Sequence, residues 1–419
     1  MADGHVEVWV ELADGPVLVG RMHCHRRRQT ESATFAYEDS WVGRPGAYAI
    51  DPQLPLASGA FQTAARQAIF PAISDTAPDS WGRRLIRRNE RRRTEREGGS
   101  VRSLREIDLV LGVRDDLRQG ALRFRLAGDP VFQAPEEEGI PHLVNLPRLL
   151  QAAANLENDR PSDEDLELLL HAGSSLGGAR PKAHVIDTAG RLAIAKFPRP
   201  TLDSWDVQAW EKLALTLAER SGINTPDSEL IDVDGSHILI VYRFDRAGPE
   251  RRIGYVSAMT LLETGDNEPR SYLDIAAAIE ENSPEVERDL HEIWRRIALS
   301  VLISNSDDHL RNHGFLHDGR GGWALSPIFD VNPDPTNTGY LSTAITDADA
   351  TASIDNLLGV AALFRLNPAQ AHRVLGEVHG AVSTWRHAAR EIGISTDSID
   401  SMEPAFAGLE QANPSRIAS

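Results

Sequence analysis

The sequence has almost no cysteine and no long apolar run, and both absences narrow the classes of protein that it can encode. The single cysteine, Cys24, excludes an intramolecular disulfide framework and fits a reducing compartment. No apolar run approaches the about 20 residues that span a bilayer. Residues 1–15 carry acids within their apolar alternation, which is unlike a secretory signal. We therefore expect a cytoplasmic protein.

Positive charge is also scarce, because 44 lysines and arginines face 62 acids and the net charge is −18. A nucleic-acid backbone is bound by concentrated Lys and Arg, so nonspecific binding by the whole surface is disfavoured. The one basic cluster is residues 83–96, RRLIRRNERRRTER. This pattern is typical either of a solvated helix face or of a patch that meets DNA or an acidic partner.

The composition is that of a globular protein, with 419 residues, 41% hydrophobic and 25% charged, enough for two or three domains. The first fifty residues alternate in short apolar runs and predict a small β-rich unit. Pro78-Asp79-Ser80 predicts the start of a charged helical stretch that is broken at residues 98–99. A segment rich in Gly, Pro and Glu, residues 128–141, predicts a subdomain boundary.

Residues 303–316 crowd acids, amides and imidazoles between two apolar flanks. Asp307 and Asn312 stand five residues apart, the separation of the catalytic aspartate and the metal-binding asparagine in a kinase catalytic loop. Asp330 follows a short predicted hairpin, where a kinase places its other magnesium ligand. All three positions agree with the phosphoryl-transfer chemistry of a kinase. The Asp307 to Asn312 pattern alone also occurs by chance in solvated loops.

The other polar residues of this stretch allow a second interpretation. His309 and His313 are four residues apart and, with Asp307, would suit a transition metal. We favour a role for His309 in orienting the catalytic loop by hydrogen bonding. Asp308 is expected to be solvated.

Residues 173–182, GSSLGGARPK, form a loop of small residues that would let the backbone approach a phosphate and present amide hydrogens to it. Ser175, Gly177 and Gly178 are the candidate contacts. Most loops of this composition are only turns. The pattern G-x-x-x-x-G-K-[ST] is absent, which disfavours a P-loop NTPase.

Lys196 closes the second of two predicted strands, residues 183–186 and 192–197. Its position resembles that of the kinase lysine that meets ATP phosphates, although a lysine that snorkels at a strand end is the commoner case. Glu211 lies on a predicted helix, residues 205–220, with Ser204 as the cap. This carboxylate would pair with Lys196, and an exposed helical glutamate is the alternative.

Residues 236–246 predict a buried strand that ends in charged residues, where the chain would cross from a β-rich part to a helical part. Backbone groups near Tyr242, Phe244 and Asp245 would bond adenine at such a crossing, and an ordinary core strand with a polar exit is the alternative. The next helices are expected at residues 271–279, from the cap Ser283-Pro284 onward, and at residues 354–364 and 368–392.

The sequence closely resembles the HipA family of bacterial toxin kinases over nearly its whole length. Five motifs in the right order carry this resemblance, PDSWGR (78–83), SLGGARPK (175–182), YRFDR (242–246), NSDDHLRN (305–312) and SPIFD (326–330). It implies an α+β, protein-kinase-like fold with two lobes. Its expected parts are a β-rich N-terminal subdomain with a helical segment (1–130), a kinase N-lobe with the Gly-rich loop (131–245) and an all-α C-lobe (246–419).

The resemblance also implies an activity and its residues. The activity is that of an ATP- and magnesium-dependent serine/threonine kinase, the toxin of a toxin-antitoxin pair, which phosphorylates a translation component such as an aminoacyl-tRNA synthetase. By this likeness Asp307 accepts the proton of the substrate hydroxyl. Asn312 and Asp330 hold Mg²⁺, and Lys196 contacts the phosphates of ATP.

Ser175 looks like the serine that family members autophosphorylate, with Ser174 as a second candidate. A phosphate there adds about −1.5 to −2 charges to a loop that receives ATP, so we expect loop displacement and self-inactivation. Two residues depart from the family pattern: Pro181 restricts the loop, and Tyr242 stands where an acid is often found.

The likeness further implies a partner, a small helix-turn-helix antitoxin of HipB type that supplies the DNA contacts. Two other functions stay open. One is a kinase that acts on a small molecule or lipid, because kinase-like folds serve both. The other is a non-catalytic corepressor that only binds an antitoxin.

Overall fold

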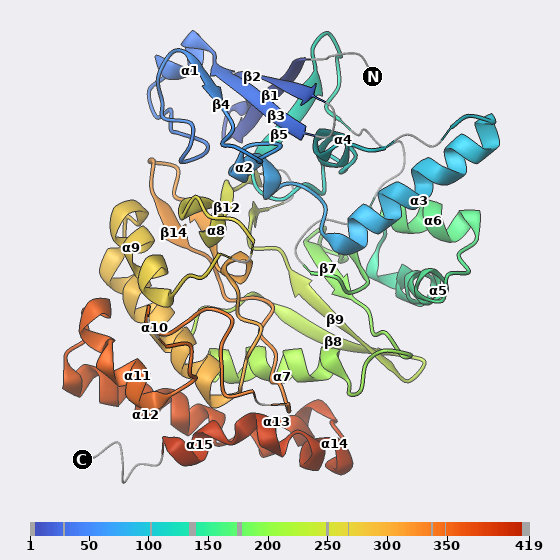
Figure 1. Ribbon diagram of the computed structural model, residues 1–419. Coiled ribbons are helices and arrows are strands. Elements are labelled where there is room, and N and C mark those ends of the chain that lie inside the picture. The colour runs from blue at the N-terminus through green and yellow to red at the C-terminus, as the bar shows by residue number, and fades with distance from the viewer. Residues whose placement is uncertain are drawn as a thin grey trace.

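The computed structural model describes residues 5–27, 30–100, 103–133, 140–173, 178–248, 251–266, 268–336, 338–347 and 349–412. An antiparallel sheet in the order β4-β3-β2-β1-β5 opens the chain (Figure 1). Val6, Val8 and Val10 alternate into its core, which confirms the predicted strand pattern. The strands are β1 (His5–Leu12), β2 (Gly15–Arg27), β3 (Thr30–Tyr37), β4 (Ala60–Gln62) and β5 (Leu122–Leu126).

Helix α3 (Ser80–Glu97) follows the first four strands in the sequence and packs against α6 (Asp163–His171) (Figure 1). It begins where the sequence predicts, because the side chain of Asp79 accepts a hydrogen bond from Gly82 N at 2.8 Å. It ends at Gly98 in the left-handed conformation, φ 67°. The other helices of this part of the chain are α1 (Asp39–Val42), α2 (Pro71–Ser74), α4 (Glu106–Leu111) and α5 (Leu146–Glu157), with a 3₁₀ turn at Leu143–Asn145.

The basic face of α3 meets acids of the same chain. Arg88 Nη1 lies 2.6 Å from Asp159 Oδ1. Further ion pairs join Arg84 to Glu157, and Arg92 and Arg96 to Asp163. Part of the basic cluster that suggested an acidic partner is therefore engaged by the α5–α6 region.

A second antiparallel sheet follows in the order β6-β7-β9-β8 (Figure 1). Its strands are β6 (Lys182–Ile186), β7 (Leu192–Lys196), β8 (Ser228–Val233) and β9 (Ser236–Tyr242). Helix α7 (Val207–Arg220) packs against β9 and β8. The prediction that Ser204 caps this helix is wrong, because the carboxylate of Asp206 accepts the bond from Ala209 N at 3.1 Å.

The remaining chain is mainly helical. Helix α10 (Val286–Leu302) leads into the polar stretch at 303–316. It begins two residues after Pro284, the first helical residue that the sequence predicts. Short strands interrupt the expected all-α part: β10 (Arg246–Ala247) pairs with β11 (Arg251–Arg252), and β12 (Tyr255–Ser257), β13 (Gly314–His317) and β14 (Trp323–Leu325) form a sheet. The other helices are α8 (Ala258–Leu261), α9 (Tyr272–Asn282), α11 (Ile354–Gly359), α12 (Pro368–Val382), α13 (Trp385–Ile392), α14 (Thr396–Ser401) and α15 (Gly408–Gln411), with 3₁₀ turns at Leu310–Asn312, Ala361–Phe364 and Glu403–Phe406.

Two hydrophobic cores hold these parts together. The larger one joins the N-terminal sheet, α7 and the C-terminal helices. The smaller one joins α3, α5 and α6 to the second sheet, and Trp81 and Leu85 are the α3 residues within it. Among the described residues, no helix has the length and apolarity to cross a membrane.

Candidate active site

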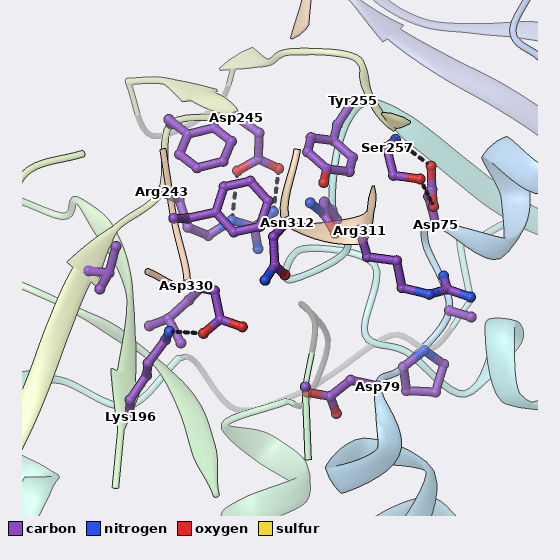
Figure 2. A pocket seen from close by; sticks show the side chains of 18 of the residues that line it. Asp75, Asp79, Lys196, Arg243, Asp245, Tyr255, Ser257, Arg311, Asn312 and Asp330 are labelled. Atoms are coloured by element: carbon purple, nitrogen blue, oxygen red, sulfur yellow. Dashed lines mark hydrogen bonds and ion pairs between the residues drawn. The ribbon is translucent and has the colours of Figure 1, made fainter. Parts of the chain in front are cut away.

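A cavity of about 580 Å³ lies where three parts of the chain meet. The segment around α2 and α3 supplies Asp75 and Asp79, the second sheet supplies Lys196, and the polar segments after α10 supply Asn312 and Asp330. Figure 2 shows these side chains around one space. The volume is in the range that holds drug-sized ligands and cofactors.

Lys196 is held between two carboxylates. Its Nζ lies 2.6 Å from Glu211 Oε1 and 2.8 Å from Asp330 Oδ1. Burial opposes the charge of the ammonium, but the carboxylates of Asp330 and Glu211 outweigh it and raise the pKa of Lys196. The structure therefore brings Lys196 together with Glu211, 15 positions away in the sequence, and with Asp330, 134 positions away.

Asp330 has a left-handed backbone, with φ 56°. Few residues other than glycine adopt this conformation, so the packing of the segment must hold it. Burial again opposes ionisation, but the ammonium groups of Lys196 and Lys182 lower the pKa of Asp330 to about 2. The preceding residue, Phe329, packs against Phe244 with ring centroids 5.6 Å apart.

Asn312 and Asp307 lie on one tight loop. The side-chain amide of Asn312 donates to the backbone oxygen of Asp307 at 3.2 Å, which leaves the amide oxygen of Asn312 to face other partners. Asp307 is exposed and is not among the residues that line the cavity, which it meets through its bond with the lining residue Asn312. Partial burial and the carboxylates of Asp330, Asp308 and Asp334 raise the pKa of Asp307, against the attraction of His309.

The prediction that Asp308 is solvated is wrong. Its side chain is buried, with the residue 6% exposed, and accepts hydrogen bonds from the hydroxyls of Tyr272 and, at 3.3 Å, Ser300. His313 Nε2 lies 3.2 Å from Asp308 Oδ1. This carboxylate anchors the loop that contains Asp307 and Asn312 to α9 and α10.

His309 shapes the loop through its backbone. Its N–H donates to Asp307 O at 3.0 Å, and its carbonyl accepts from Asn312 N at 2.8 Å. Its ring Nδ1 is buried without a hydrogen-bond partner. Within the described part of the chain, no group of three or more His, Cys, Asp or Glu side chains is placed to hold a metal, so Asp307, His309 and His313 do not form the three-ligand site considered above.

Only the end of the Gly-rich loop can be placed. Ser174, Ser175 and Gly177 lie outside the described residues. Gly178 has φ 93° and lines the cavity. Beyond it, Arg180 Nη1 lies 2.5 Å from Asp203 Oδ1, and Lys182 Nζ lies 2.7 Å from Asp79 Oδ2.

The crossing segment lines the cavity with Tyr242, Phe244 and Asp245. The Tyr242 hydroxyl donates to Glu229 Oε1 at 2.9 Å. The Asp245 carboxylate is 3% exposed and accepts from Arg243 Nε at 2.7 Å and Gly120 N at 2.7 Å. Burial opposes ionisation, but the neighbouring arginines hold the pKa of Asp245 well below its usual range.

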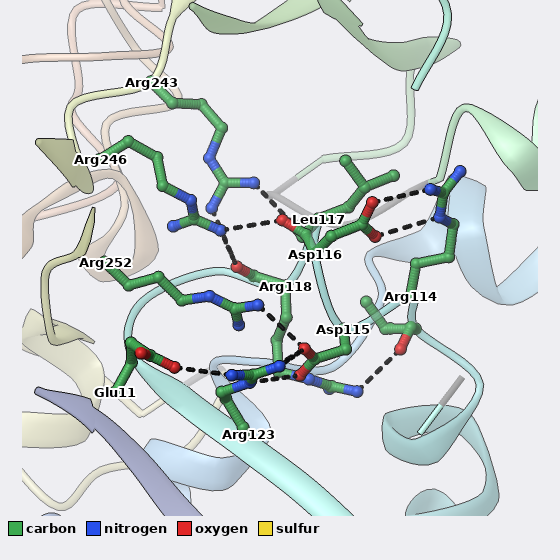
Figure 3. A network of polar contacts seen from close by, with 11 residues as sticks. Glu11, Arg114, Asp115, Asp116, Leu117, Arg118, Arg123, Arg243, Arg246 and Arg252 are labelled. Carbon is green, nitrogen blue, oxygen red and sulfur yellow. Dashed lines mark hydrogen bonds and ion pairs between the residues drawn. The ribbon is translucent and has the colours of Figure 1, made fainter. Parts of the chain in front are cut away.

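The arginines of the crossing segment tie it to the loop before β5 (Figure 3). Arg246 Nη2 donates to Arg118 O at 2.7 Å, and Arg243 Nη1 donates to Leu117 O at 2.5 Å. Arg252 Nη2 lies 3.0 Å from Asp115 Oδ2. The carboxylate of Asp245 therefore acts within a structural network, and contacts to a ligand at this point would come from the backbone.

Comparisons with known proteins place the chain in a family. Residues 174–385 match the HipA-like C-terminal domain, and residues 13–104 match the HipA N-terminal domain. The chain belongs to the HipA family. HipA of Shewanella oneidensis MR-1, from a complex with HipB and operator DNA, has a similar fold, with a TM-score of 0.67, 15% identity, and coverage of 97% of this chain and 96% of that one. The HipA fold is α+β, with a kinase-like arrangement of two lobes.

Two curated relatives match shorter segments. A Haemophilus influenzae protein named "Putative kinase" is 28% identical over 142 residues, 30% of this chain and 41% of that protein. A Sinorhizobium fredii protein named "Putative kinase Y4dM" is 25% identical over 173 residues, 36% of this chain and 42% of that protein. The chain thus spans about two fifths of the length of these relatives.

Sequence reasoning missed the part of this HipA-family cavity that comes from the N-terminal region. Asp79 and Arg83 line it, and Arg83 Nη1 donates to Glu106 Oε2 at 2.8 Å. The motif at residues 78–83 was visible, but no spacing related it to residues 100 positions away. A signal for Lys182 did exist, because Lys182 and Lys196 are equidistant from Ala189, which lies midway between the two predicted strands.

Proposed function

We propose that this HipA-family chain is an ATP- and magnesium-dependent serine/threonine protein kinase that acts as the toxin of a toxin-antitoxin pair. The observation that carries the proposal is the cluster of Lys196, Glu211 and Asp330 in a cavity that Asn312 also lines. A lysine and glutamate pair beside a metal-binding aspartate is the arrangement that protein kinases need for phosphoryl transfer. The names of the curated relatives point the same way.

The residues present fit a magnesium ion. Asn312 and Asp330 offer an amide oxygen and a carboxylate at one cavity, and Asp330, with a pKa of about 2, is ionised at neutral pH. Mg²⁺ in nucleotide sites takes one or two protein oxygens and completes its shell with phosphates and water. When bound, it neutralises the charge of the phosphates.

The chain's own groups then have distinct roles. The Lys196 ammonium, fixed by Glu211, binds phosphate oxygens. Asp307 accepts the proton of the substrate hydroxyl, and its exposed position gives a protein substrate access to it. Phe244 and Phe329 offer apolar faces to the adenine at the crossing segment.

The partner is an antitoxin of HipB type, and DNA binding is indirect. The Shewanella relative of similar fold occurs in a complex with HipB and operator DNA. A net charge of −18 suits a chain that leaves the DNA contacts to its partner. An aminoacyl-tRNA synthetase is the proposed protein substrate, and autophosphorylation at Ser175 or Ser174 stays a prediction.

The kinase proposal is tested with γ-labelled ATP, cell extract and the full chain. Wild type is expected to transfer label to protein, and Asp307→Asn to lose at least about 100-fold of the rate because it lacks the general base. In cells, Asp307→Asn should no longer inhibit growth while it still binds its antitoxin.

Other outcomes would identify other functions. Label that enters only the small-molecule fraction indicates a small-molecule or lipid kinase. Equal growth inhibition by wild type and Asp307→Asn, without any label transfer, indicates a non-catalytic corepressor. Either result rejects the toxin-kinase proposal.

A further inference from the structure

A second lysine and carboxylate pair lies beside the first one. Lys182 on β6 is the direct cross-strand partner of Lys196 on β7, so both side chains leave the same face of the sheet. Lys196 is held by Glu211 from α7, and Lys182 is held by Asp79 at the start of α3. Each lysine therefore has a carboxylate partner from a different helix.

The pair of Lys182 and Asp79 is more deeply buried than that of Lys196. The Lys182 and Asp79 side chains are 5% and 2% exposed. A buried ion pair of this kind is a costly arrangement that holds both groups in place, because neither charge can be left without its partner. Trp81 adds a second tie, since its Nε1 donates to the backbone oxygen of Lys182 at 3.1 Å.

The Lys182 ammonium lies close to Gly178, the end of the Gly-rich loop. A Cβ placed on Gly178 would be 3.4 Å from Lys182 Nζ, and Gly178 lines the cavity. Asp79, the ion-pair partner of Lys182, also lines the cavity. An ammonium has three N–H donors, so its contact to Asp79 does not exclude a phosphate oxygen as a further acceptor.

We infer that Lys182 is a second phosphate-binding lysine and that Asp79, from the start of α3, is its positioning residue. Helix α3 therefore sets the affinity for the phosphates of the nucleotide in the way that α7 does through Glu211 and Lys196. This inference rests on the proposed function, because it requires a nucleotide in the cavity. It gives the motif at residues 78–83 a role at the site itself.

Asp79→Asn tests the role of Asp79 without removing the helix cap, because asparagine caps a helix as well as aspartate does. Equilibrium dialysis of the full chain with labelled ATP should give binding about tenfold weaker than in wild type, the factor expected for one charged contact. Labelled adenosine, which has no phosphate, should bind both proteins equally. In phosphotransfer, the change should fall on KM for ATP more than on kcat.

A double variant, Asp79→Asn with Lys182→Met, leaves no unpaired charge in the buried pair and should bind ATP at least as weakly as Asp79→Asn. Asp159→Asn is the matched control. It removes the same charge from a partner of α3 at a residue with φ 59°, which asparagine tolerates, and it should bind ATP like wild type.

Failure of this inference and failure of the proposed function give different results. If wild type binds ATP and Asp79→Asn binds it as tightly or more tightly, the inference is overturned and the kinase proposal stands. Equal weakening of ATP and adenosine would show that Asp79 only supports the fold, which also overturns it. If wild type binds no ATP, the proposed function fails and the inference fails with it.

Discussion

At the scale of single residues, the cavity is built from charges that neutralise one another. Lys196 contacts Glu211 and Asp330, and Lys182 contacts Asp79. Despite burial, Lys196 and Asp330 stabilise each other's charged form, which raises the pKa of Lys196 and lowers the pKa of Asp330. The pair of Lys196 and Asp330 therefore stays charged at neutral pH.

A buried acid outside the cavity provides a test by pH. Asp51 is 1% exposed and accepts from Gln53 N at 2.8 Å and Ala72 N at 2.6 Å. Burial raises the pKa of Asp51 from 3.8 to about 7, although these backbone bonds oppose the shift. Between these two values the folded chain holds a proton that the unfolded chain has lost, so the contribution of Asp51 to stability falls as the pH rises from about 4 to about 7.

Replacement of Asp51 should remove this dependence. The thermal midpoint of wild type is expected to exceed that of Asp51→Asn by more at pH 5 than at pH 8, in scanning calorimetry of the full chain. The comparison of the two proteins cancels the other titrating groups. An equal difference at both pH values would contradict the raised pKa of Asp51.

The sequence predicted some of these residues well and others poorly. The Asp307 to Asn312 spacing is local, so the loop that they share follows from the sequence, and Lys196 and Glu211 are linked by the order of strand and helix. Asp308 was misjudged because burial against Tyr272 depends on tertiary packing, which the local pattern does not contain. The network around Asp245 was missed for the same reason.

At the scale of elements, α3 differs most from its appearance in the sequence. Its arginines suggest a solvated helix, yet its first turn enters the smaller hydrophobic core and the wall of the cavity. Its start and end could be predicted from Asp79 and Gly98, because capping residues are local signals. Its docking could not be predicted, because Trp81 and the backbone of Lys182 are 101 residues apart.

The anchoring of α3 can be measured. Leu85 is 0% exposed within the smaller core, so Leu85→Ala should lower the free energy of unfolding by about 2–5 kcal/mol. The control is Leu363→Ala, at a residue that is 57% exposed, which should change it by less than about 0.5 kcal/mol. Chemical denaturation followed by tryptophan fluorescence compares them. Similar values for both variants would mean that α3 is not held by this core.

At the scale of the whole molecule, the cavity joins regions that the sequence suggested as separate parts. The N-terminal region supplies Asp79, the second sheet Lys196, and the helical part Asp330. The division at residues 130 and 245 stays a prediction, although the loop before β5 and the crossing segment are tied by the arginine network of Figure 3. The order of β-rich and helical parts followed from periodicity, whereas their meeting point depends on long-range contacts.

The central claim is that the cluster of Lys196, Asn312 and Asp330 binds ATP together with Mg²⁺. Isothermal titration calorimetry of the full chain with ATP, with and without Mg²⁺, tests it most directly. Wild type should bind ATP more tightly when Mg²⁺ is present, and Asp330→Asn should lose this dependence because it lacks the metal-binding carboxylate. Absence of ATP binding by wild type, or the same Mg²⁺ dependence in Asp330→Asn, would contradict the claim.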